Sequence, residues 1–437
     1  MSTIDRRAFL GAGGAALVAG ALAGCRSAGG GSGSDGSGGG PDGDALRVAW
    51  YGGQPAHEGI EGALAAFGED HPDSSIATEK APFGDYWDRL ATQVAGGDGP
   101  DVLRMSMTFL AEYADRGALL DLGDYVGEVI DTDALDEDVA TSGALNDGLY
   151  GIGQSSITHA TFRNTGLASE HGLELPEQWS WADFTEFCTS FAEAAGPGKY
   201  GSTDAGGDFQ MFEVWARQHG TDLFDEQGLA VGAGVIEEWL VMWQDLRAAG
   251  AVPPPDVTAE SDTFETSQLS QLNAAVTFGW VQQVAFLQPL VPEHPLAVGP
   301  VPGLTAGSLD GQFVKALDFW CVMNTSANQD TAAELIDFLL NDERAVTSIG
   351  LTLGVPPSES SRELLALDPE TAEGRAVAFV DEIAGQVGPS PEAWPTGYGE
   401  LQGTAFPRLN QDVGFGAATP ADAAAQFVDE AARVFGS

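Results

Sequence analysis

Positively charged residues are scarce in this chain. Its 437 residues hold 65 Asp and Glu against 18 Lys and Arg, which gives a formal net charge of −47. Lysine occurs only at Lys80, Lys199 and Lys315. This excess of negative charge repels nucleic-acid phosphates and anionic lipid headgroups, so we expect no nucleic-acid partner. Because 43% of the residues are hydrophobic, the acidity does not indicate a disordered protein. We interpret it as a hydrated surface suited to very high salt, where the Debye length falls to about 3 Å at 1 M.

Cysteine is also rare, with Cys25, Cys188 and Cys321 as its only occurrences. Three cysteines are too few for a disulfide framework. Cys188 shares one predicted helical face with three phenylalanines, and Cys321 lies in the strand-like run FWCVM, so we interpret both as small core residues. A disulfide between these two residues remains the alternative.

Motifs for catalysis and metal binding are missing too. The sequence has no H-E-x-x-H, G-x-S-x-G or Walker pattern, and no G-x-G-x-x-G that opens a helix. Its six histidines are scattered without metal-ligand spacing. Residues 131–138, DTDALDED, lack the glycine and the terminal glutamate of an EF-hand loop, and we interpret them as surface. We therefore expect no catalytic residue, no metal site and no cofactor, and a protein that is not an enzyme.

The N-terminus reads as an export signal with an anchor. Residues 6–25 are RRAFLGAGGAALVAGALAGC, and the apolar run at 8–23 is short and glycine-rich for a membrane span, which needs about 20 apolar residues. Arg6 and Arg7 before this run are typical of a twin-arginine signal, and LAGC is typical of a lipobox, in which Cys25 is lipidated. An uncleaved N-terminal anchor is the alternative. We expect a signal at 1–24 and, at 25–44, the lipidated cysteine and a flexible Gly/Ser tether. The protein would then sit on the extracellular face of the cell membrane.

Strand-like and helix-like segments alternate from residue 46 onward. LRVAWYGG (46–53), SSIATEKA (74–81) and DVLRMSM (101–107) predict strands. EGIEGALAAFGEDHP (58–72) and FGDYWDRLATQVAGGDGP (83–100) predict the helices between them. The alternation implies a parallel sheet in an α/β domain, where ligands bind beyond the carboxyl ends of the strands. Here those ends are residues 50–54 and 105–108.

Longer segments resemble one family, in that family's order. GGDGPDVLRMSMTFLAEYADRGALLDLGDYV (96–126) resembles the first-lobe signature of extracellular solute-binding proteins of sugar-type ABC importers, the maltose-binding-protein-like family 1. The segment from DGLYGIGQSS (147–156) onward is similar to its crossing to the second lobe. SQLNAAVTFGWVQQVAF (270–286) resembles its aromatic-bearing strand, and residues 314–350 resemble its returning strand and long helix. Behind the lipobox, the whole resembles a haloarchaeal-type lipoprotein.

This resemblance implies an α/β, periplasmic-binding-protein-like fold, with two α/β lobes, a hinge and a ligand cleft between the lobes. Lobe 1 is expected at 45–157 and 316–355, and lobe 2 at 158–315 and 356–437, with hinge crossings near 156–160, 315–320 and 353–357. The implied function is capture of a sugar or oligosaccharide by a monomer and delivery to the permease subunits of an ABC importer. The same fold binding a polyamine, an organic anion or a metal is one alternative. An extracellular glycoside-active enzyme is another.

Aromatic and polar residues in these segments are the predicted ligand contacts, because sugar rings stack on aromatic faces while their hydroxyls need polar partners. The aromatic candidates are Trp50, Tyr51, Trp87, Trp280, Trp320 and Trp394. Trp280 stands where sugar-binding relatives carry a stacking aromatic residue, and we expect it to be exposed after its strand. The polar candidates are Gln54, Asp208, Gln210 and Asp318.

Two methionines depart from the pattern of some sugar-binding relatives. Met105 and Met107 stand near a position where those relatives carry tryptophan, and methionine stacks less specifically on a sugar ring. We include both among the predicted ligand contacts. The substitution argues against maltodextrin and favours another oligosaccharide, a monosaccharide or a polyol phosphate. The tryptophans at 179, 181, 239 and 243 are predicted as core residues.

Overall fold

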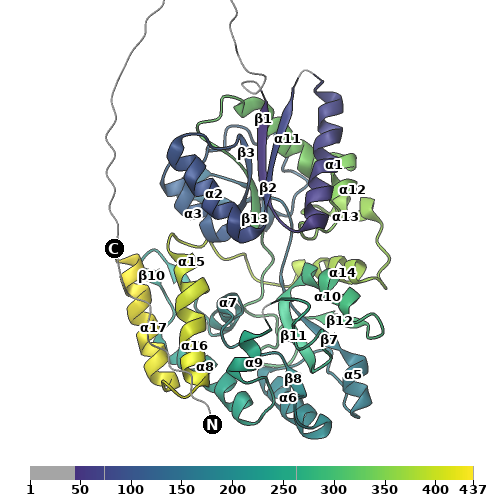
Figure 1. Ribbon diagram of the computed structural model, residues 1–437, viewed down its shortest axis with the longest axis vertical. Coiled ribbons are helices and arrows are strands. Elements are labelled where there is room, and N and C mark those ends of the chain that lie inside the picture. The colour runs from purple at the N-terminus through teal and green to yellow at the C-terminus, as the bar shows by residue number, and fades with distance from the viewer. Residues whose placement is uncertain (1–44, 73, 262, 437) are drawn as a thin grey trace, which may run out of the picture. The chain divides into compact units, whose positions relative to one another are not determined.

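Two β-sheets organise the part of the chain that the computed structural model describes, residues 45–436 without 73 and 262 (Figure 1). The predicted signal with Arg6 and Arg7, the Cys25 anchor and the tether to residue 44 lie outside the described residues. None of the helices within the described range is long and apolar enough to cross a membrane.

The sheet of lobe 1 has the strand order β2-β1-β3-β13-β6. Its strands are β1 (Leu46–Tyr51), β2 (Ile76–Ala81), β3 (Val102–Ser106), β6 (Ile152–Gly153) and β13 (Asp318–Val322). β1 runs parallel to β2 and β3, as the alternating pattern predicts. β13 pairs antiparallel with β3 and with β6, because the chain reaches it on its return from lobe 2. The sheet is therefore mixed rather than fully parallel.

Helices cover both faces of this sheet. α1 (Gln54–Asp70), α11 (Gln329–Asn341) and α12 (Glu343–Ile349) pack on one face, whereas α2 (Phe83–Gly96) and α3 (Met107–Asp115) pack on the other (Figure 1). Side chains alternate along a strand, so Val48 and Trp50 of β1 join the α1 side while Ala49 and Tyr51 join the α2 side. The buried apolar cluster on the α2 side continues into lobe 2.

The sheet of lobe 2 has the strand order β12-β7-β11-β8. Its strands are β7 (His159–Asn164), β8 (Tyr200–Ser202), β11 (Ala274–Trp280) and β12 (Leu296–Gly299). The principal helices around it are α6 (Trp181–Ala195), α7 (Phe209–Gln218), α8 (Ala233–Ala248) and α14 (Ala372–Ala384). The four tryptophans predicted for the core are buried here. Cys188 and Cys321 are buried and free, which confirms them as core residues and rules out the alternative disulfide.

The C-terminal helices close the chain against lobe 2 and also reach lobe 1. α16 (Phe406–Gly414) and α17 (Pro420–Phe435) pack on α8, and their Phe406 and Phe427 form an aromatic contact with Phe209 of α7. α15 (Tyr398–Glu400) contacts α3 of lobe 1. Just before α15, the Thr396 hydroxyl donates a hydrogen bond to Asp115 at 2.8 Å.

Three segments cross between the lobes and pair with one another. Isolated β-bridges join Ser156 to Val355 and Ile157 to Lys315. Asp136 adds a polar tie, since its carboxylate accepts hydrogen bonds from the Ser156 hydroxyl at 2.5 Å and from Arg362 at 3.0 Å. From the sequence, Asp136 was expected to be a surface residue of the segment 131–138. The structure differs, because this residue links the first crossing to the helix that follows the third.

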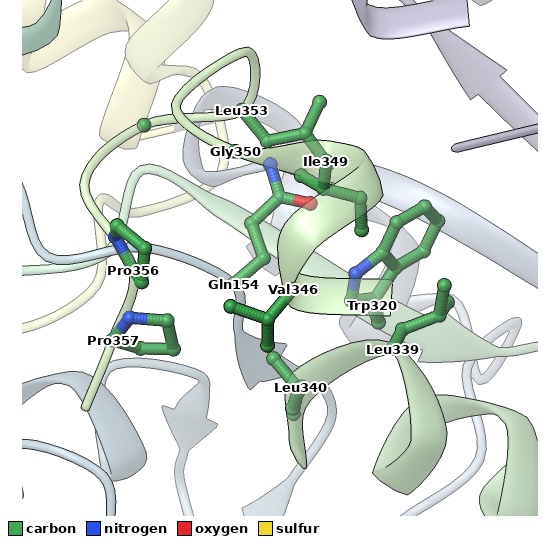
Figure 2. A pocket seen from close by; sticks show the side chains of 11 residues that line it. Gln154, Trp320, Leu339, Leu340, Val346, Ile349, Gly350, Leu353, Pro356 and Pro357 are labelled. Carbon is green, nitrogen blue, oxygen red and sulfur yellow. The ribbon is translucent and has the colours of Figure 1, made fainter. Parts of the chain in front are cut away.

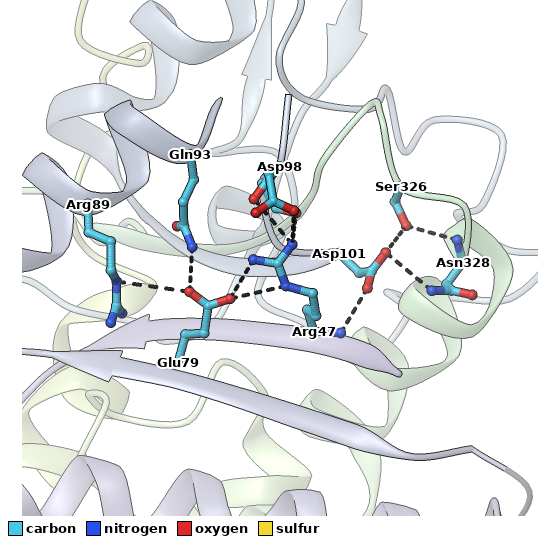
Figure 3. Close-up of polar contacts among 9 residues, drawn as sticks. Arg47, Glu79, Arg89, Gln93, Asp98, Asp101, Ser326 and Asn328 are labelled. Carbon is cyan, nitrogen blue, oxygen red and sulfur yellow. Dashed lines mark hydrogen bonds and ion pairs between the residues drawn. The ribbon is translucent and has the colours of Figure 1, made fainter. Parts of the chain in front are cut away.

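A polar network fixes the amino-terminal end of lobe 1's sheet, opposite the end where ligands are expected (Figure 3). Arg47 at the start of β1 pairs with Glu79 at 2.7 Å and with Asp98 at 2.9 Å. Asp101 accepts from the Arg47 backbone amide at 2.8 Å and from the Ser326 hydroxyl at 2.5 Å, next to the start of α11. Arg47, one of the few positively charged residues of the chain, thus holds three segments of lobe 1 in position relative to one another.

Candidate functional site

The carboxyl ends of parallel strands mark where a site is expected in each lobe. In lobe 1, β1 ends at Tyr51 and β3 ends at Ser106. In lobe 2, β8 ends at Ser202 and runs parallel to β11, which ends at Trp280. The crossing segment that contains Lys315 enters β13 at Asp318 and so connects the two edges.

In lobe 1 a polar group, which we call the Tyr51 cluster, consists of Tyr51, Arg104, Gln154 and Asp318. The Tyr51 hydroxyl donates to one oxygen of Asp318, and Arg104 Nη2 donates to the other at 2.8 Å. Arg104 Nη1 also donates to the Tyr51 carbonyl at 2.8 Å, and its guanidinium lies 4.3 Å from the Tyr51 ring centroid. With the Gln154 amide oriented so that its oxygen faces Arg104, this oxygen accepts from Nε and Nη2 at 3.0 Å. Every member of the cluster is therefore fixed by another.

Burial sets the electrostatics of the Tyr51 cluster. Loss of water raises the pKa of Asp318 and lowers the pKa of Arg104 to about 9, because burial disfavours both charged forms. The contacts from Arg104 and Tyr51 oppose this effect by favouring the carboxylate. The Asp318 side chain keeps 20% of its surface exposed, against 8% for Arg104. The carboxylate is thus a pre-oriented acceptor that a ligand hydroxyl can reach.

Aromatic rings surround Tyr51 on the α2 side. Its ring lies 5.0 Å from Phe83, 5.2 Å from Tyr86 and 5.5 Å from Trp87, measured between centroids. Trp87 packs in turn on Phe109 at 4.3 Å. Phe83, the first residue of α2, is 49% exposed. Trp87 was predicted from the sequence as a ligand contact, but Phe83 was not. Phe83 directly follows Pro82 at the start of a helix, and this position was a signal that the sequence offered.

In lobe 2 the Trp280 cluster consists of His159, Gln210 and Trp280. The Trp280 indole N–H donates to Gln210 Oε1 at 3.1 Å, and its ring stacks on His159 at 3.7 Å. Burial lowers the pKa of His159 to about 3, so the imidazole is neutral. Asp208 caps α7 by accepting from the amides of Gln210 and Met211, both at 3.0 Å. Trp280 is only 7% exposed, so the expectation of an exposed tryptophan is wrong: its own contacts cover it.

A third group, the Lys315 cluster, lies beside the Trp280 cluster and contains Glu213, Phe313, Lys315, Trp394 and Tyr398. The Trp394 indole N–H donates to both oxygens of Glu213, at 3.1 and 3.2 Å, and its ring stacks on Tyr398 at 4.0 Å. Lys315 Nζ lies 4.7 Å from the Trp394 centroid and 5.5 Å from that of Phe313. Among the described residues this ammonium has no hydrogen-bond acceptor.

Burial also shifts the charged groups of the Lys315 cluster. It lowers the pKa of Lys315 to about 8 and raises the pKa of Glu213, while the charges of the two residues partly oppose these shifts. Lys315 was not among the residues predicted as ligand contacts. Its signal was present, because it is one of only three lysines and it stands in a predicted crossing segment.

The remaining predicted contacts lie apart from the three clusters. Trp50 is fully buried on the α1 side, where its indole N–H donates to His57 at 3.0 Å. Trp320 lies on the same side and lines a cavity of about 30 Å³ with Gln154 and the crossing at 350–357 (Figure 2). Met105 and Met107 are completely buried. The exposed Gln54 bonds to Glu58 of its own helix at 2.7 Å. A ligand-binding role for these residues stays a prediction, because the structure does not bring them together in one place.

Comparison with known proteins agrees with this architecture. Residues 54–345 match the family model of the bacterial extracellular solute-binding proteins. An extracellular solute-binding protein of family 1 from Alicyclobacillus acidocaldarius superposes with a TM-score of 0.70 and 28% identity, covering 90% of this chain and 98% of that one. A periplasmic oligogalacturonide-binding protein from Yersinia enterocolitica, in complex with saturated digalacturonic acid, gives 0.76 and 23%, covering 90% and 98%.

A third relative extends the comparison of the fold. An ABC substrate-binding protein from Listeria monocytogenes, in complex with cycloalternan, gives a TM-score of 0.76 and 18% identity, covering 90% of this chain and all of that one. At such low identity the Yersinia and Listeria structures are relatives in fold alone. The family match, however, spans more than half of the chain. This chain therefore belongs to the family of bacterial extracellular solute-binding proteins.

Proposed function

We propose that this protein is the substrate-binding lipoprotein of an ABC importer, and that it captures a sugar or oligosaccharide between its lobes for delivery to a membrane permease. One observation carries the ligand class. At the edge of lobe 2, Trp280 is fixed by Gln210 and stacks on His159, with 7% of its surface exposed, and the edge of lobe 1 presents the Asp318 carboxylate, fixed by Arg104 and Tyr51. An aromatic face together with a pre-oriented acceptor is what a sugar ring with hydroxyls requires.

The carboxylates of the three clusters do not favour the enzyme alternative. A glycosidase needs two carboxyl groups that face one scissile bond. Both oxygens of Asp318 accept hydrogen bonds from Tyr51 and Arg104, and both oxygens of Glu213 accept from Trp394. These carboxylates hold neighbouring side chains in place, which suits binding without turnover. Digalacturonic acid and cycloalternan, the ligands of two relatives in fold, are both carbohydrates.

The lobes are proposed to move about the three crossings predicted near 156–160, 315–320 and 353–357, which the bridges Ser156–Val355 and Ile157–Lys315 join. A few residues at the ends of elements absorb such a hinge motion. The Tyr51 cluster belongs to lobe 1 and the Trp280 cluster to lobe 2, so closure would bring a bound sugar between them. The domain boundaries predicted from the sequence, 45–157 with 316–355 and 158–315 with 356–437, are part of this proposal.

Anchoring and environment complete the proposal. Arg6 and Arg7 would direct export and Cys25 would carry the lipid, so that a monomer is held by its tether near the permease subunits on the outer face of the membrane. The net charge of −47 supports a protein adapted to very high salt. The support for these points is the sequence, since the residues concerned precede the described part of the chain.

Tryptophan fluorescence titration in molar salt tests the ligand class. The protein is titrated with a panel of sugars, a polyamine and a divalent metal, and each mixture is assayed for released product. We expect saturable quenching by a sugar with no product. Trp280→Phe keeps a ring and loses the N–H donor to Gln210, so binding should weaken about tenfold. Trp243→Phe, a change in the lobe 2 core, is the matched control and should leave affinity unchanged. Saturation only by the polyamine or the metal, or release of product, would refute the proposal.

A further inference from the structure

A polar hollow of about 200 Å³ lies in lobe 2 beside the Trp280 cluster. It is bounded by the segment after β8, the N-cap of α7, β11, and Pro253, Thr258 of α9 (Pro255–Ala259), Ser261, Ser267 and Gln268. Figure 1 shows where β8, β11, α7 and α9 lie. At about 10–15 Å³ for each water, it has room for roughly 13 to 20 waters, on the scale of one sugar ring. None of the residues that line it is a member of the three clusters.

The walls of the hollow are rich in hydroxyl and carboxylate groups. The lining includes Thr203, Asp204, Asp208, Ser267, Gln268 and Thr277. The hydroxyls of Thr203 and Thr277 bond to each other at 2.8 Å. Each hydroxyl retains further hydrogen-bonding capacity, since a hydroxyl is one donor and two acceptors. Asp208 bonds the α7 amides through Oδ1 alone, so its second oxygen is available to a ligand donor.

The charges around the hollow indicate which ligands it would reject. Arg247 is the nearby cation, and it is held by Asp204 through two hydrogen bonds, at 2.6 and 2.9 Å, and by Asn410 at 2.8 Å. No lysine lies in the lining, and Asp208 adds a second carboxyl group. A uronate or phosphate group would meet carboxyl groups, and the charge of Arg247 is already paired with Asp204, although its buried Nη1 has no hydrogen-bond partner among the described residues. A neutral sugar would supply hydroxyl donors for them.

Two exposed aromatic rings are close in sequence to the walls of the hollow and to Trp280. Phe264 lies in the segment that borders the hollow, and its ring stacks on Phe286 at 5.6 Å. The two side chains are 36% and 37% exposed, an apolar surface with no covering partner among the described residues. Phe286 belongs to α10 (Val284–Leu287), which follows Trp280 after one 3₁₀ turn. Asp208 in the wall of the hollow accepts from the backbone amide of Gln210, and the Gln210 side chain bonds Trp280, so the hollow adjoins the Trp280 cluster.

We propose that this hollow is a second carbohydrate subsite, selective for an uncharged sugar unit, and that the protein therefore takes ligands of two or more linked units. This inference rests on the proposed function. A first unit contacts Trp280 and the Tyr51 cluster, and a second unit places its hydroxyls on Thr203, Thr277 and Asp208.

The double substitution Thr203→Val/Thr277→Val tests the subsite. Because each hydroxyl is the other's partner, removing both leaves neither unpaired and preserves the shape. Thr185→Val/Thr189→Val is the matched control, since these hydroxyls on α6 bond only to their own helix backbone. Calorimetric titration in molar salt uses glucose, cellobiose, cellotriose, xylose, xylobiose, xylotriose, digalacturonic acid and putrescine.

We expect the wild-type protein to bind a neutral di- or trisaccharide at least tenfold more tightly than its monosaccharide. The Thr203→Val/Thr277→Val variant should lose about tenfold of that preference and keep the monosaccharide affinity, whereas the control should match wild type. Equal affinity for single and linked units overturns the subsite, as does an unchanged preference in the variant. Binding of digalacturonic acid or putrescine that the variant abolishes overturns its selectivity for neutral sugars. If the wild-type protein binds no sugar at all, the proposed function itself fails.

Discussion

Lys315 allows a quantitative prediction, because its ammonium is fully buried on a crossing segment. The groups that face it are Glu213 and Arg217 from α7 and the neutral His159 from β7. Burial lowers its pKa from 10.5 to about 8. At 1.36 kcal/mol for each pH unit, the buried charge costs the folded state about 3 kcal/mol near neutral pH.

The sign of the pH dependence follows from proton binding. Below pH 8 Lys315 is protonated in both the folded and the unfolded state, so the full free-energy cost of the buried charge applies. Between pH 8 and 10.5 the unfolded chain keeps a proton that the folded chain releases, so the free energy of unfolding rises with pH. Above 10.5 both states are neutral and the contribution no longer changes. Buried tyrosines also titrate at high pH, so the difference between wild type and a Lys315 variant is the quantity to measure.

Urea unfolding in molar salt, between about pH 7 and 11, provides that difference. Relative to Lys315→Met, the wild-type free energy of unfolding should increase by about 3 kcal/mol across the window. Lys199→Met is the matched control, because the Lys199 ammonium has acceptors on Leu272 and Asn273 at 2.9 and 3.0 Å. If the difference in the free energy of unfolding between wild type and Lys315→Met does not change with pH, Lys315 is not a buried lysine whose charge destabilises the folded state.

Three further outcomes are expected. Asp318→Asn removes a carboxylate that Arg104 and Tyr51 both use, and leaves a buried guanidinium without its counter-charge. Thermal unfolding should show a loss of about 3–5 kcal/mol, against little or no loss for Asp70→Asn in its exposed pair with Arg344; equal losses would contradict the buried pair. Cys25→Ser should move the protein from the membrane fraction to the medium, measured by immunoblot, and retention on the membrane would contradict a lipid anchor. Dialysis from molar to low salt should lower the melting temperature, because self-repulsion is no longer screened; an unchanged value would remove the argument for salt adaptation.

The sequence predicted most of lobe 1 because its signals there are local. The strands that end at Tyr51, Ala81 and Ser106, and the helices between them, follow from hydrophobic periodicity and from glycine and proline breaks. The antiparallel place of β13 between β3 and β6 does not follow from such signals. Its place depends on pairing with β3, a contact between residues far apart in the chain.

The candidate site was predictable in part. The structure places Trp280 with Gln210, and Tyr51 with Asp318, through direct hydrogen bonds. Trp50 lies elsewhere for a reason readable in the sequence: adjacent residues of a strand point to opposite faces, so Trp50 and Tyr51 cannot both face the cleft. Arg104 also had a signal, as a charged residue inside an otherwise apolar strand.

The interior position of β13 also constrains the order in which the protein folds. This strand lies between β3 and β6, yet the ribosome delivers it after all four strands of the lobe 2 sheet. Until then β3 exposes an open edge, and the β3–β13 pairing must close a very long loop. We expect lobe 2 to acquire its sheet first and lobe 1 to follow. Pulse-labelled hydrogen exchange during refolding should therefore protect the amides of β7 and β11 before those of β3.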